Sequence, residues 1–525
     1  MEVLGLVDIP TWLQWILVLV GLVSAYVISM SWNHGIFKKM GVDGPKPHLI
    51  FGNFKMLLKH GVVKTDENMY KKYGKVFGIH ETYVPSLFIG DPELIKEILV
   101  KKFKSFPNRK NILDDFTDRT MSESMSILKN DRWRFVRGAI SPTFSGKKLR
   151  QMTHLVNSSV DKLLENIERK VEVDEDIDMK KFVGRFTTDM VASTIFGLDV
   201  ERQYDKEDSF TRHAQTLFTV DKLGSFVSII YLARFLAWIL LYINRYGKGS
   251  IQQKAFRFFL QTTEKAIEER RESLGKYSDF LGILVDSEAK KLEEKHDEAA
   301  GVRTEKEDNQ TSPKQWTRKK LTDSEIISQA LMLMFAGYHT ITNQLCFILY
   351  HLAIYPDICD KLLQEIDENL NGEVPTYDTV GKLTYLEMCI NETMRLFPAA
   401  NRLTREASND VTIGNINIPK GLVIHIPAGA IHKDPQYWSE PETFNPERFT
   451  PEAKASRIPF VFLPFGDGPR NCIGMRLALL ELKIAVGRIL QTYRPVKCSK
   501  TEVPIKISNL GNIPVGLFLK FEKRN

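Results

Sequence analysis

The stretch Thr11–Trp32 contains no charged side chain. At about 1.5 Å per residue, a helix of this length can cross the hydrocarbon core of a bilayer. Acidic residues precede the stretch, and Lys38 and Lys39 follow it, so the positive-inside rule places the bulk of the chain in the cytosol. The alternative, a cleaved signal peptide, would have a basic start and a shorter apolar run. We therefore expect residues 1–35 to form a single amino-terminal transmembrane anchor.

The rest of the chain predicts one large domain behind a stiff connection. Residues 36–50 contain a Gly-Pro-Lys-Pro sequence, whose prolines favour a rigid linker. The chain is 43% hydrophobic, and its five cysteines include no C-x-x-C pair, which argues against a disulfide framework and for a reducing compartment. The net charge of +7 arises without a dense Lys/Arg tract, so we exclude nucleic acid as a partner.

Hydrophobic periodicity predicts a mainly α-helical fold with small β-sheets. Residues 132–197 have a helical pattern, and a capping box at Thr322–Glu325 begins a long helix that ends near Pro356. A last helix spans about Met475–Tyr493. A helix with proline in its first turn is expected over Pro92–Val100. Short strands are predicted at residues 76–81, 86–89, 411–413 and 422–426.

Two further segments are distinguished by their composition. Phe226–Ile243 is strongly apolar but contains one arginine and is flanked by glycines. It is either a second membrane span, a surface segment that dips into the bilayer or a buried core helix, and the charge favours the second interpretation over the first. Asp286–Lys320 is rich in charged residues and poor in apolar ones, which predicts a solvated loop.

The segment Pro464–Gly474 places one cysteine, Cys472, just before the start of the last predicted helix. Free backbone N–H groups and the helix dipole favour an anion at that position, so the sulfur is suited to remain a thiolate. Gly468 and Gly474 remove side chains where the backbone has to approach the sulfur or a bound group closely. A buried structural cysteine near a turn is the alternative interpretation.

The spacing F-x-x-G-x-R-x-C-x-G, from Phe465 to Gly474, fixes five positions and occurs by chance in roughly one chain of this length in ten thousand. It resembles the haem-binding signature of the cytochromes P450. The resemblance implies that residues 51–525 are a haem-thiolate catalytic domain holding haem b. Cys472 would be the axial ligand of the iron, Phe465 would pack near the sulfur, and Arg470 would pair with a haem propionate.

Other motifs of the same family occur at the matching places. Trp133 and Arg137 resemble its W-x-x-x-R motif, and with Arg405 they would hold propionates, as would Arg109 if its spacing fits. An E-x-x-R sequence is usually only a surface pair. Here a Pro-Glu-Arg-Phe sequence follows downstream, and the resemblance implies a buried structural triad made of Glu392, Arg395 and Arg448.

Residues 336–340, Ala-Gly-Tyr-His-Thr, resemble the distal-pocket motif of the family. Thr340 would hydrogen-bond dioxygen or its water, and the small Ala336 would leave room beside the haem. The family usually has an acid where this chain has His339; an imidazole also shuttles protons, and the alternative is an ordinary surface hydrogen bond. The substrate pocket is expected to be apolar and to include Ser126, Met332, Phe335, Ala336 and Ala400.

Within the superfamily, residues 141–144, 418–421 and 464–476 read most like the vertebrate family 3 enzymes, which oxidise drugs and steroids. The resemblance implies a monooxygenase that inserts one oxygen atom from O2 into lipophilic substrates. The alternative is an endoperoxide isomerase of the thromboxane synthase type, which needs no external electrons. Thr340 favours monooxygenation, whereas Ile341–Asn343 resembles thromboxane synthase. A haem-binding sensor without turnover is a third hypothesis.

The resemblance also implies a location and partners. The enzyme would sit in the endoplasmic reticulum membrane by its single anchor, with a cytosolic catalytic domain. Electrons would come from NADPH–cytochrome P450 reductase, with or without cytochrome b5 as a second donor, because no nicotinamide or flavin site is visible in the sequence. One basic cluster is either a docking face for the reductase or an ordinary solvated face. It consists of Arg132, Arg134, Lys147, Lys148 and Arg150.

Overall fold

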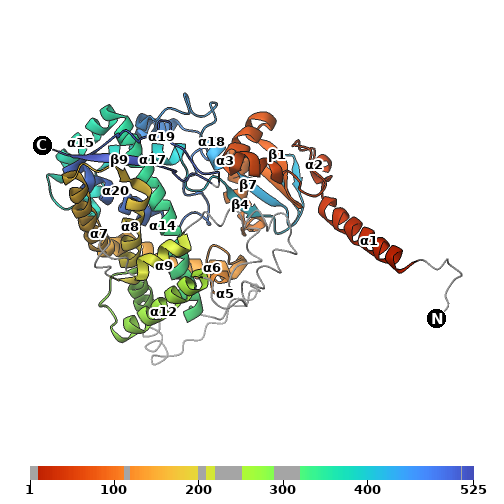
Figure 1. Cartoon of the computed structure of the whole chain (residues 1–525), viewed down its shortest axis with the longest axis horizontal. Helices are drawn as coiled ribbons and strands as arrows, with labels where there is room; N and C mark the ends of the chain where they lie inside the picture. Colours follow the sequence, from red (N-terminus) through yellow and green to blue (C-terminus); the bar gives the residue numbers. More distant parts are fainter. Residues whose placement is uncertain are drawn as a thin grey trace, which may run out of the picture.

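The computed structural model describes residues 10–110, 119–198, 209–218, 251–288, 320–509 and 511–524. The predicted apolar segment Phe226–Ile243, and most of Asp286–Lys320, lie outside these residues. The described part is mainly helical, as predicted, with three small sheets (Figure 1). The longer helices are α1 (Thr11–Ser31), α3 (Phe54–Tyr73), α6 (Asn130–Ile140), α7 (Gly146–Glu172), α8 (Met179–Phe196), α9 (Ser209–Phe218), α12 (Ile251–Glu272), α14 (Asp323–Ile354), α15 (Pro356–Leu370), α17 (Thr384–Leu396) and α20 (Met475–Thr492).

Short helices connect these elements: α2 (Ile36–Lys39), α4 (Pro92–Lys96), α5 (Arg119–Ser122), α16 (Tyr377–Val380), α18 (Ala428–Ile431) and α19 (Pro451–Ser456), with 3-10 turns at Phe103–Ser105, Ser141–Phe144 and Pro446–Phe449. The predicted helix Pro92–Val100 is divided, because α4 passes into a π-helix at Glu97–Lys101. The strands are β1 (Val76–Glu81), β2 (Val84–Ile89), β3 (Ile177–Asp178), β4 (Leu403–Glu406), β5 (Val411–Ile413), β6 (Ile416–Ile418), β7 (Val423–Ile426), β8 (Tyr493–Val496) and β9 (Phe518–Lys523).

The largest sheet has the strand order β1-β2-β7-β4. Strands β1 and β2 form an antiparallel hairpin, with Val76 opposite Ile89. The parallel pairing of β2 with β7 joins residues more than three hundred positions apart, such as Phe88 and His425. Strand β4 then lies antiparallel to β7. The sheet thereby brings the segment that follows α17 against the amino-terminal part of the domain.

The helical core is built around α8 and α14. Almost the whole of α8 is buried, and it packs against α7 and α14, while α20 packs against both α7 and α14. The predicted capping box begins α14: the Glu325 amide donates to Thr322 Oγ1 (3.1 Å), and the Thr322 amide donates to Glu325 Oε2 (2.8 Å). These reciprocal bonds satisfy amides that a helix start leaves open. The helix ends before Pro356, which begins α15.

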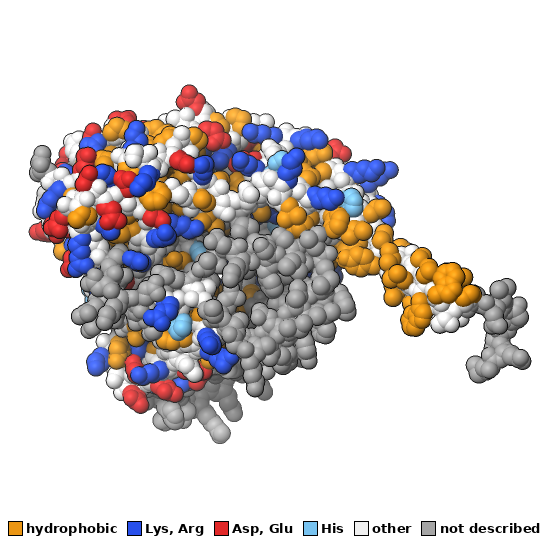
Figure 2. All heavy atoms as spheres, viewed as in Figure 1, with side chains coloured by type: hydrophobic (Ala, Val, Ile, Leu, Met, Phe, Trp, Pro, Cys, Tyr) orange, Lys and Arg blue, Asp and Glu red, His pale blue; other side chains and the backbone are white. Residues whose placement is uncertain are grey.

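The amino-terminal helix α1 projects away from the body, with apolar side chains along its exposed surface (Figures 1 and 2). Among the described residues, Thr11–Lys39 is the stretch that is helical, long and apolar enough to cross a membrane. The predicted linker 36–50 packs on β1, since Phe37 is buried and the Gly78 amide donates to the Asp43 carbonyl oxygen (2.8 Å). The contact with β1 thus fixes the position at which the anchor helix is attached to the catalytic domain.

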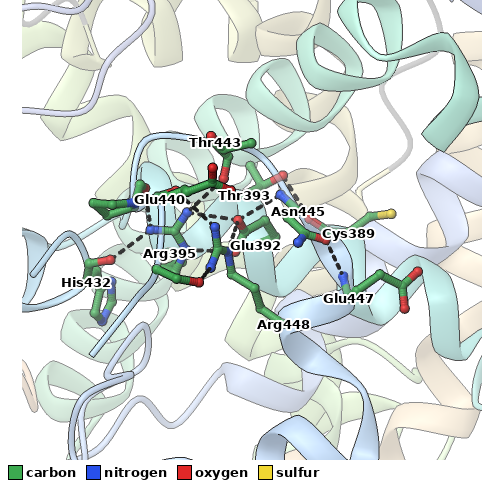
Figure 3. A network of polar contacts seen from close by, with 12 residues as sticks. Cys389, Glu392, Thr393, Arg395, His432, Glu440, Thr443, Asn445, Glu447 and Arg448 are labelled. Carbon is green, nitrogen blue, oxygen red and sulfur yellow. Dashed lines mark hydrogen bonds and ion pairs between the residues drawn. The ribbon is translucent and has the colours of Figure 1, made fainter. Parts of the chain in front are cut away.

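The three residues of the predicted charge triad meet between α17 and the 3-10 turn at Pro446–Phe449 (Figure 3). Glu392 and Arg395 are fully buried and form two hydrogen bonds, of 2.7 and 2.8 Å. Arg448 Nε reaches Glu392 Oε1 at 3.3 Å. Arg395 also donates to the carbonyl oxygen of His432 (2.9 Å), and the Asn445 amide donates to Glu392 (2.9 Å). Because these bonds join α17 to the chain between α18 and α19, the triad cross-links two distant segments.

Substituting Arg395 by Met should lower the free energy of unfolding by about 3–5 kcal/mol, because it leaves Glu392 buried and undercompensated. The measurement is urea unfolding of the purified protein. As the matched control, Arg150→Met removes the exposed ion pair with Asp378, and this change should have little effect on stability. Equal effects of the two substitutions would contradict a structural role for the triad.

Candidate active site

A cavity of about 510 Å³ lies between α6, α8, α14, the segment after α17 and the loop before α20. Most of the side chains that the sequence singled out meet on its wall, although they come from positions more than three hundred residues apart. The predicted residues that line the cavity are Arg109, Ser126, Trp133, Arg137, Met332, Ala336, Thr340, Ala400, Arg405, Phe465, Arg470, Cys472 and Gly474.

Three of the predicted site residues do not line this cavity: Phe335, His339 and Gly468. Successive residues of an α-helix are rotated by about 100°, so Phe335 and His339 lie off the face of α14 that carries Ala336 and Thr340. Gly468 has a positive φ of 73°, and a Cβ there would lie 2.1 Å from the Leu99 carbonyl oxygen. Its close approach is therefore to the backbone after α4.

The loop that carries Cys472 folds back on itself. The Cys472 amide donates to the Phe465 carbonyl oxygen at 2.9 Å, and Gly466, at φ 69°, makes the turn between them. A Cβ on Gly474 would meet no protein atom within 4 Å. The Cys472 side chain lies within the protein and is accessible from the cavity that it lines. The sulfur is thus presented to the cavity just before α20 begins.

Two opposing effects act on the Cys472 thiol. Burial raises its pKa, because the interior disfavours a charged sulfur. The amides of Gly474 and Met475 and the positive charges of Arg137 and Arg109 act in the opposite direction. A thiolate at this position therefore needs a positive partner beyond those the protein supplies, which a bound metal ion provides.

Four guanidinium groups surround the sulfur side of the cavity. Arg137 donates to the carbonyl oxygen of Asn471 (3.1 Å) and to its side-chain oxygen (2.9 Å). Arg109 donates to the Arg470 carbonyl oxygen (2.8 Å), and the Arg470 guanidinium lies 4.4 Å from the centre of the Trp133 ring. Arg405, the fourth, donates to the Thr404 carbonyl oxygen (2.9 Å). Arg137 and Arg109 thus hold the loop that carries Cys472, and all four groups place positive charge on the cavity wall.

Arg405 has a strongly perturbed pKa. Burial, together with repulsion from Arg109, lowers its pKa to about 9. Its Nε is buried without a hydrogen-bond partner among the described residues, and no described carboxylate forms an ion pair with Arg405, Arg109 or Arg137. A cavity wall with unneutralised cations fits an anionic group, since carboxylates pair with guanidiniums in planar, two-bond geometry.

The face of α14 that borders the cavity carries Thr340. Its Oγ1 donates to the Ala336 carbonyl oxygen at 2.7 Å, which leaves its lone pairs available as acceptors. His339 has a different environment: burial, with a contribution from Lys180, lowers its pKa to about 4. Its imidazole is therefore neutral at pH 7.

Sequence reasoning missed several cavity residues, including Gln344, Arg402 and Glu481. Arg402 forms ion pairs with Asp66 and Glu81, and no sequence pattern joins residues that are so far apart. Gln344 had a usable signal, because it lies one helical turn after Thr340. Glu481 had a weaker one, as the acidic residue in an otherwise apolar part of the last helix.

The sequence profile of the cytochrome P450 family matches residues 42–521. The chain belongs to the cytochrome P450 family. Cytochrome P450 3A11 of Mus musculus is 38% identical over 503 residues, which cover 95% of this chain and 94% of that protein. Cytochrome P450 3A7 of Homo sapiens is 36% identical over 496 residues, covering 94% and 93%. The lithocholate 6-beta-hydroxylase of Mesocricetus auratus is 36% identical over 513 residues, covering 97% and 95%.

The chain is therefore a P450 monooxygenase, an oxidoreductase whose cofactor is haem. The cavity fits that cofactor by its own chemistry. Haem presents an iron that accepts a thiolate and two propionates that need cations. The wall carries one cysteine sulfur and five guanidiniums, of which that of Arg402 is paired with the carboxylates of Asp66 and Glu81, and the position of Gly474 leaves space next to the sulfur.

Substituting Arg405 by Leu in this P450 should weaken haem retention by about tenfold or more, because a charge-assisted hydrogen bond contributes about 1.5–3 kcal/mol. The rate of haem transfer to excess apomyoglobin measures the effect. Arg134→Leu is the matched control, since Arg134 is exposed and pairs with Asp131. Equal transfer rates in Arg405→Leu, Arg134→Leu and the unmodified protein would contradict a role of Arg405 in haem binding.

Proposed function

We propose that this P450 inserts one oxygen atom from O2 into lipophilic, steroid- or xenobiotic-like substrates, with Cys472 as the axial ligand of its haem iron. The observation that carries the proposal is that the Cys472 side chain and the Thr340 hydroxyl line one largely apolar cavity. A sulfur donor and a distal hydroxyl that share a substrate-sized space are the parts that oxygen insertion needs.

The proposed division of the chain is the one that the sequence predicts. Residues 1–35 are the anchor, residues 36–50 are the linker and residues 51–525 are the catalytic domain.

Each residue around the sulfur has a distinct task in this proposal. Haem supplies the oxygen chemistry when bound, and a thiolate ligand favours cleavage of the O–O bond. Cys472 holds the iron, and Phe465 covers the loop next to the sulfur. Propionates are held by Arg137, Arg405 and Arg470, with Trp133 supporting Arg470 by stacking. Arg109 is a further candidate for binding a propionate, because its hydrogen bond to the Arg470 carbonyl oxygen holds it beside Arg470.

The distal side of the cavity positions the substrate and handles protons. Thr340 would accept a hydrogen bond at Oγ1 and pass its hydroxyl proton into the cavity, which is the proton transfer that oxygen insertion requires of the distal side. Ala336 leaves room next to it. Substrate contacts come from Ser126, Met332 and Ala400, all on the wall. Phe335 supports this face of α14 from outside the lining, and His339 remains a candidate relay group with a neutral ring.

Thr340 also favours monooxygenation over endoperoxide rearrangement. An isomerase of the thromboxane synthase type uses no external electrons and delivers no protons to dioxygen, so it does not need a distal hydroxyl. This chain presents the hydroxyl on the cavity wall. Among the relatives, one is named for a hydroxylation, lithocholate 6-beta-hydroxylase, which supports a sterol-like substrate class.

The proposed electron donor is NADPH–cytochrome P450 reductase, with cytochrome b5 as a second partner, in the endoplasmic reticulum membrane. Helix α1 supports a membrane-held enzyme with a cytosolic domain. The predicted basic face is partly neutralised, because Arg132, Arg134 and Arg150 each form ion pairs with acidic neighbours. Lys147 and Lys148, on the first turn of α7, are left as the main candidates for electrostatic docking of the reductase.

The function is tested with the full-length protein in lipid vesicles, with lithocholate as the probe and with reductase and NADPH present or omitted. We expect hydroxylated product only in the complete system, because insertion of one oxygen atom from O2 consumes two external electrons. Turnover of an endoperoxide at full rate without reductant, and no oxygenation of lithocholate or of other lipophilic probes, would contradict the proposal and support the isomerase.

A further inference from the structure

One hydroxyl group on the cavity wall has no task in the chemistry described above. Thr404 belongs to the edge strand β4 and lines the cavity. Directly opposite it, in the neighbouring strand β7, lies His425, which is 7% exposed. Thr404 Oγ1 is 3.2 Å from His425 Nδ1. A threonine hydroxyl has one proton and two lone pairs, so the hydrogen bond to the imidazole orients Oγ1 and leaves it able to bond a ligand.

The imidazole of His425 is itself held on its other side by a carboxylate. Its Nε2 lies 3.4 Å from Glu81 Oε2, and its ring centroid lies 5.1 Å from that of Phe88. Burial acts to raise the pKa of Glu81, but Arg402 and His425 together hold it below its ordinary value, so Glu81 is ionised at pH 7. Because a carboxylate only accepts hydrogen bonds, Nε2 keeps its hydrogen whether the ring is neutral or charged.

The protonation of Nδ1 therefore determines what Thr404 offers to a ligand. With a neutral ring, Thr404 donates its proton to Nδ1, and the lone pairs of Oγ1 remain for a donor in the cavity. With a protonated ring, Nδ1 donates to Oγ1, and Thr404 can donate its own proton into the cavity. The neighbouring wall residues Ala399, Ala400 and Leu403 are apolar. One oriented hydroxyl in such surroundings fixes the orientation of an apolar ligand that carries a single polar group.

We propose that Thr404 is a specificity-determining residue that binds the polar group of a lipophilic substrate, with His425 and Glu81 as its positioning residues. The neutral imidazole makes the site select a hydroxyl group, and the protonated imidazole makes it select a carbonyl group. The inference rests on the proposed function, since it concerns the lipophilic substrates of this cavity. Binding of this kind changes no covalent bond and moves no electron.

The charged groups around His425 come from three other parts of the chain. Glu81 lies on β1, Asp66 on α3 and Arg402 in the segment after α17, and β1 packs on α3 (Figure 1). The Arg402 guanidinium donates to both oxygens of Asp66 and to Glu81 Oε1, each at 2.5 Å. Strands β2 and β7 contain no other charged side chain. As the pH falls, the ring gains its second proton, so the selectivity should move from hydroxyl towards carbonyl ligands.

The test compares two probes, androstanol and androstanone, which carry one hydroxyl or one keto group at the same carbon of the same saturated steroid. Their affinities for the full-length, haem-loaded protein in lipid vesicles are measured from the shift of the ferric haem spectrum, without reductase or NADPH. The ratio of the affinity for the alcohol to that for the ketone should fall by about threefold to tenfold between about pH 8.5 and about pH 6, since one probe loses a hydrogen bond that the other gains.

Four variants assign the effect to the proposed residues. Thr404→Val removes the hydroxyl and should make the ratio independent of pH, whereas Thr404→Ser should keep the pH dependence. His425→Gln should also abolish it while retaining Glu481, the acid on the cavity wall whose pKa is raised by burial to about 8. The matched control is Thr412→Val, which should leave the ratio unchanged, because the Thr412 hydroxyl is exposed, bonds to Asn417 and lies off the cavity wall.

A ratio that does not change with pH in the unmodified protein would overturn the proposal. The same pH-dependent ratio in Thr404→Val as in the unmodified protein would overturn it as well. If neither probe shifts the spectrum of the unmodified, haem-loaded protein, the proposed substrate class fails instead.

Discussion

The proposed ligand role of Cys472 requires a negatively charged sulfur inside the protein, and this requirement is the constraint on which the account of the site depends. Burial alone disfavours the Cys472 thiolate, so the chain has to supply compensating groups within a few residues or bring them from elsewhere. It does both. The start of α20 provides backbone amides next to the sulfur, and Arg137 and Arg109 come from distant segments. The same guanidiniums then remain available for an anionic cofactor, which links protection of the sulfur to binding of the haem.

The scaffold behind the cavity holds these groups in register. The loop before α20 is bonded to α6 through Arg137 and to the segment after α4 through Arg109. The buried pair Glu392–Arg395 ties α17 to the chain that precedes this loop. A buried ion pair contributes less to net stability than to a single defined arrangement. A defined arrangement is what the site needs, because the sulfur and the distal hydroxyl have to face one space.

Features with local causes could be predicted from the sequence. The capping box at Thr322 and the neighbouring strands β1 and β2 depend on residues that are close in sequence, and the structure contains both features. The triad was also predicted, although only through the family resemblance. Features that depend on long-range contact were missed. The pairing of Arg402 with Asp66 joins residues more than three hundred positions apart, and no periodicity records such a contact.

The orientation of α14 explains the remaining differences between the predicted site residues and the residues that line the cavity. The motif at 336–340 indicated which helix borders the cavity, but the side that faces inward depends on how α14 packs against α8 and α20. His339 and Phe335 therefore lie off the lining while Gln344 lies on it. The π-helix at Glu97–Lys101 could not be predicted either, since nothing in its local sequence distinguishes it from an ordinary α-helix.

The most direct measurement is the absorption spectrum of the reduced protein with carbon monoxide, in the unmodified chain and in Cys472→Ser. A thiolate ligand gives the carbon monoxide adduct a strongly red-shifted Soret band, which we expect in the unmodified protein and not in the variant. The band should be retained in Cys498→Ser, because Cys498 does not line the cavity. A red-shifted band that persists in Cys472→Ser would contradict the assignment of Cys472 as the haem ligand.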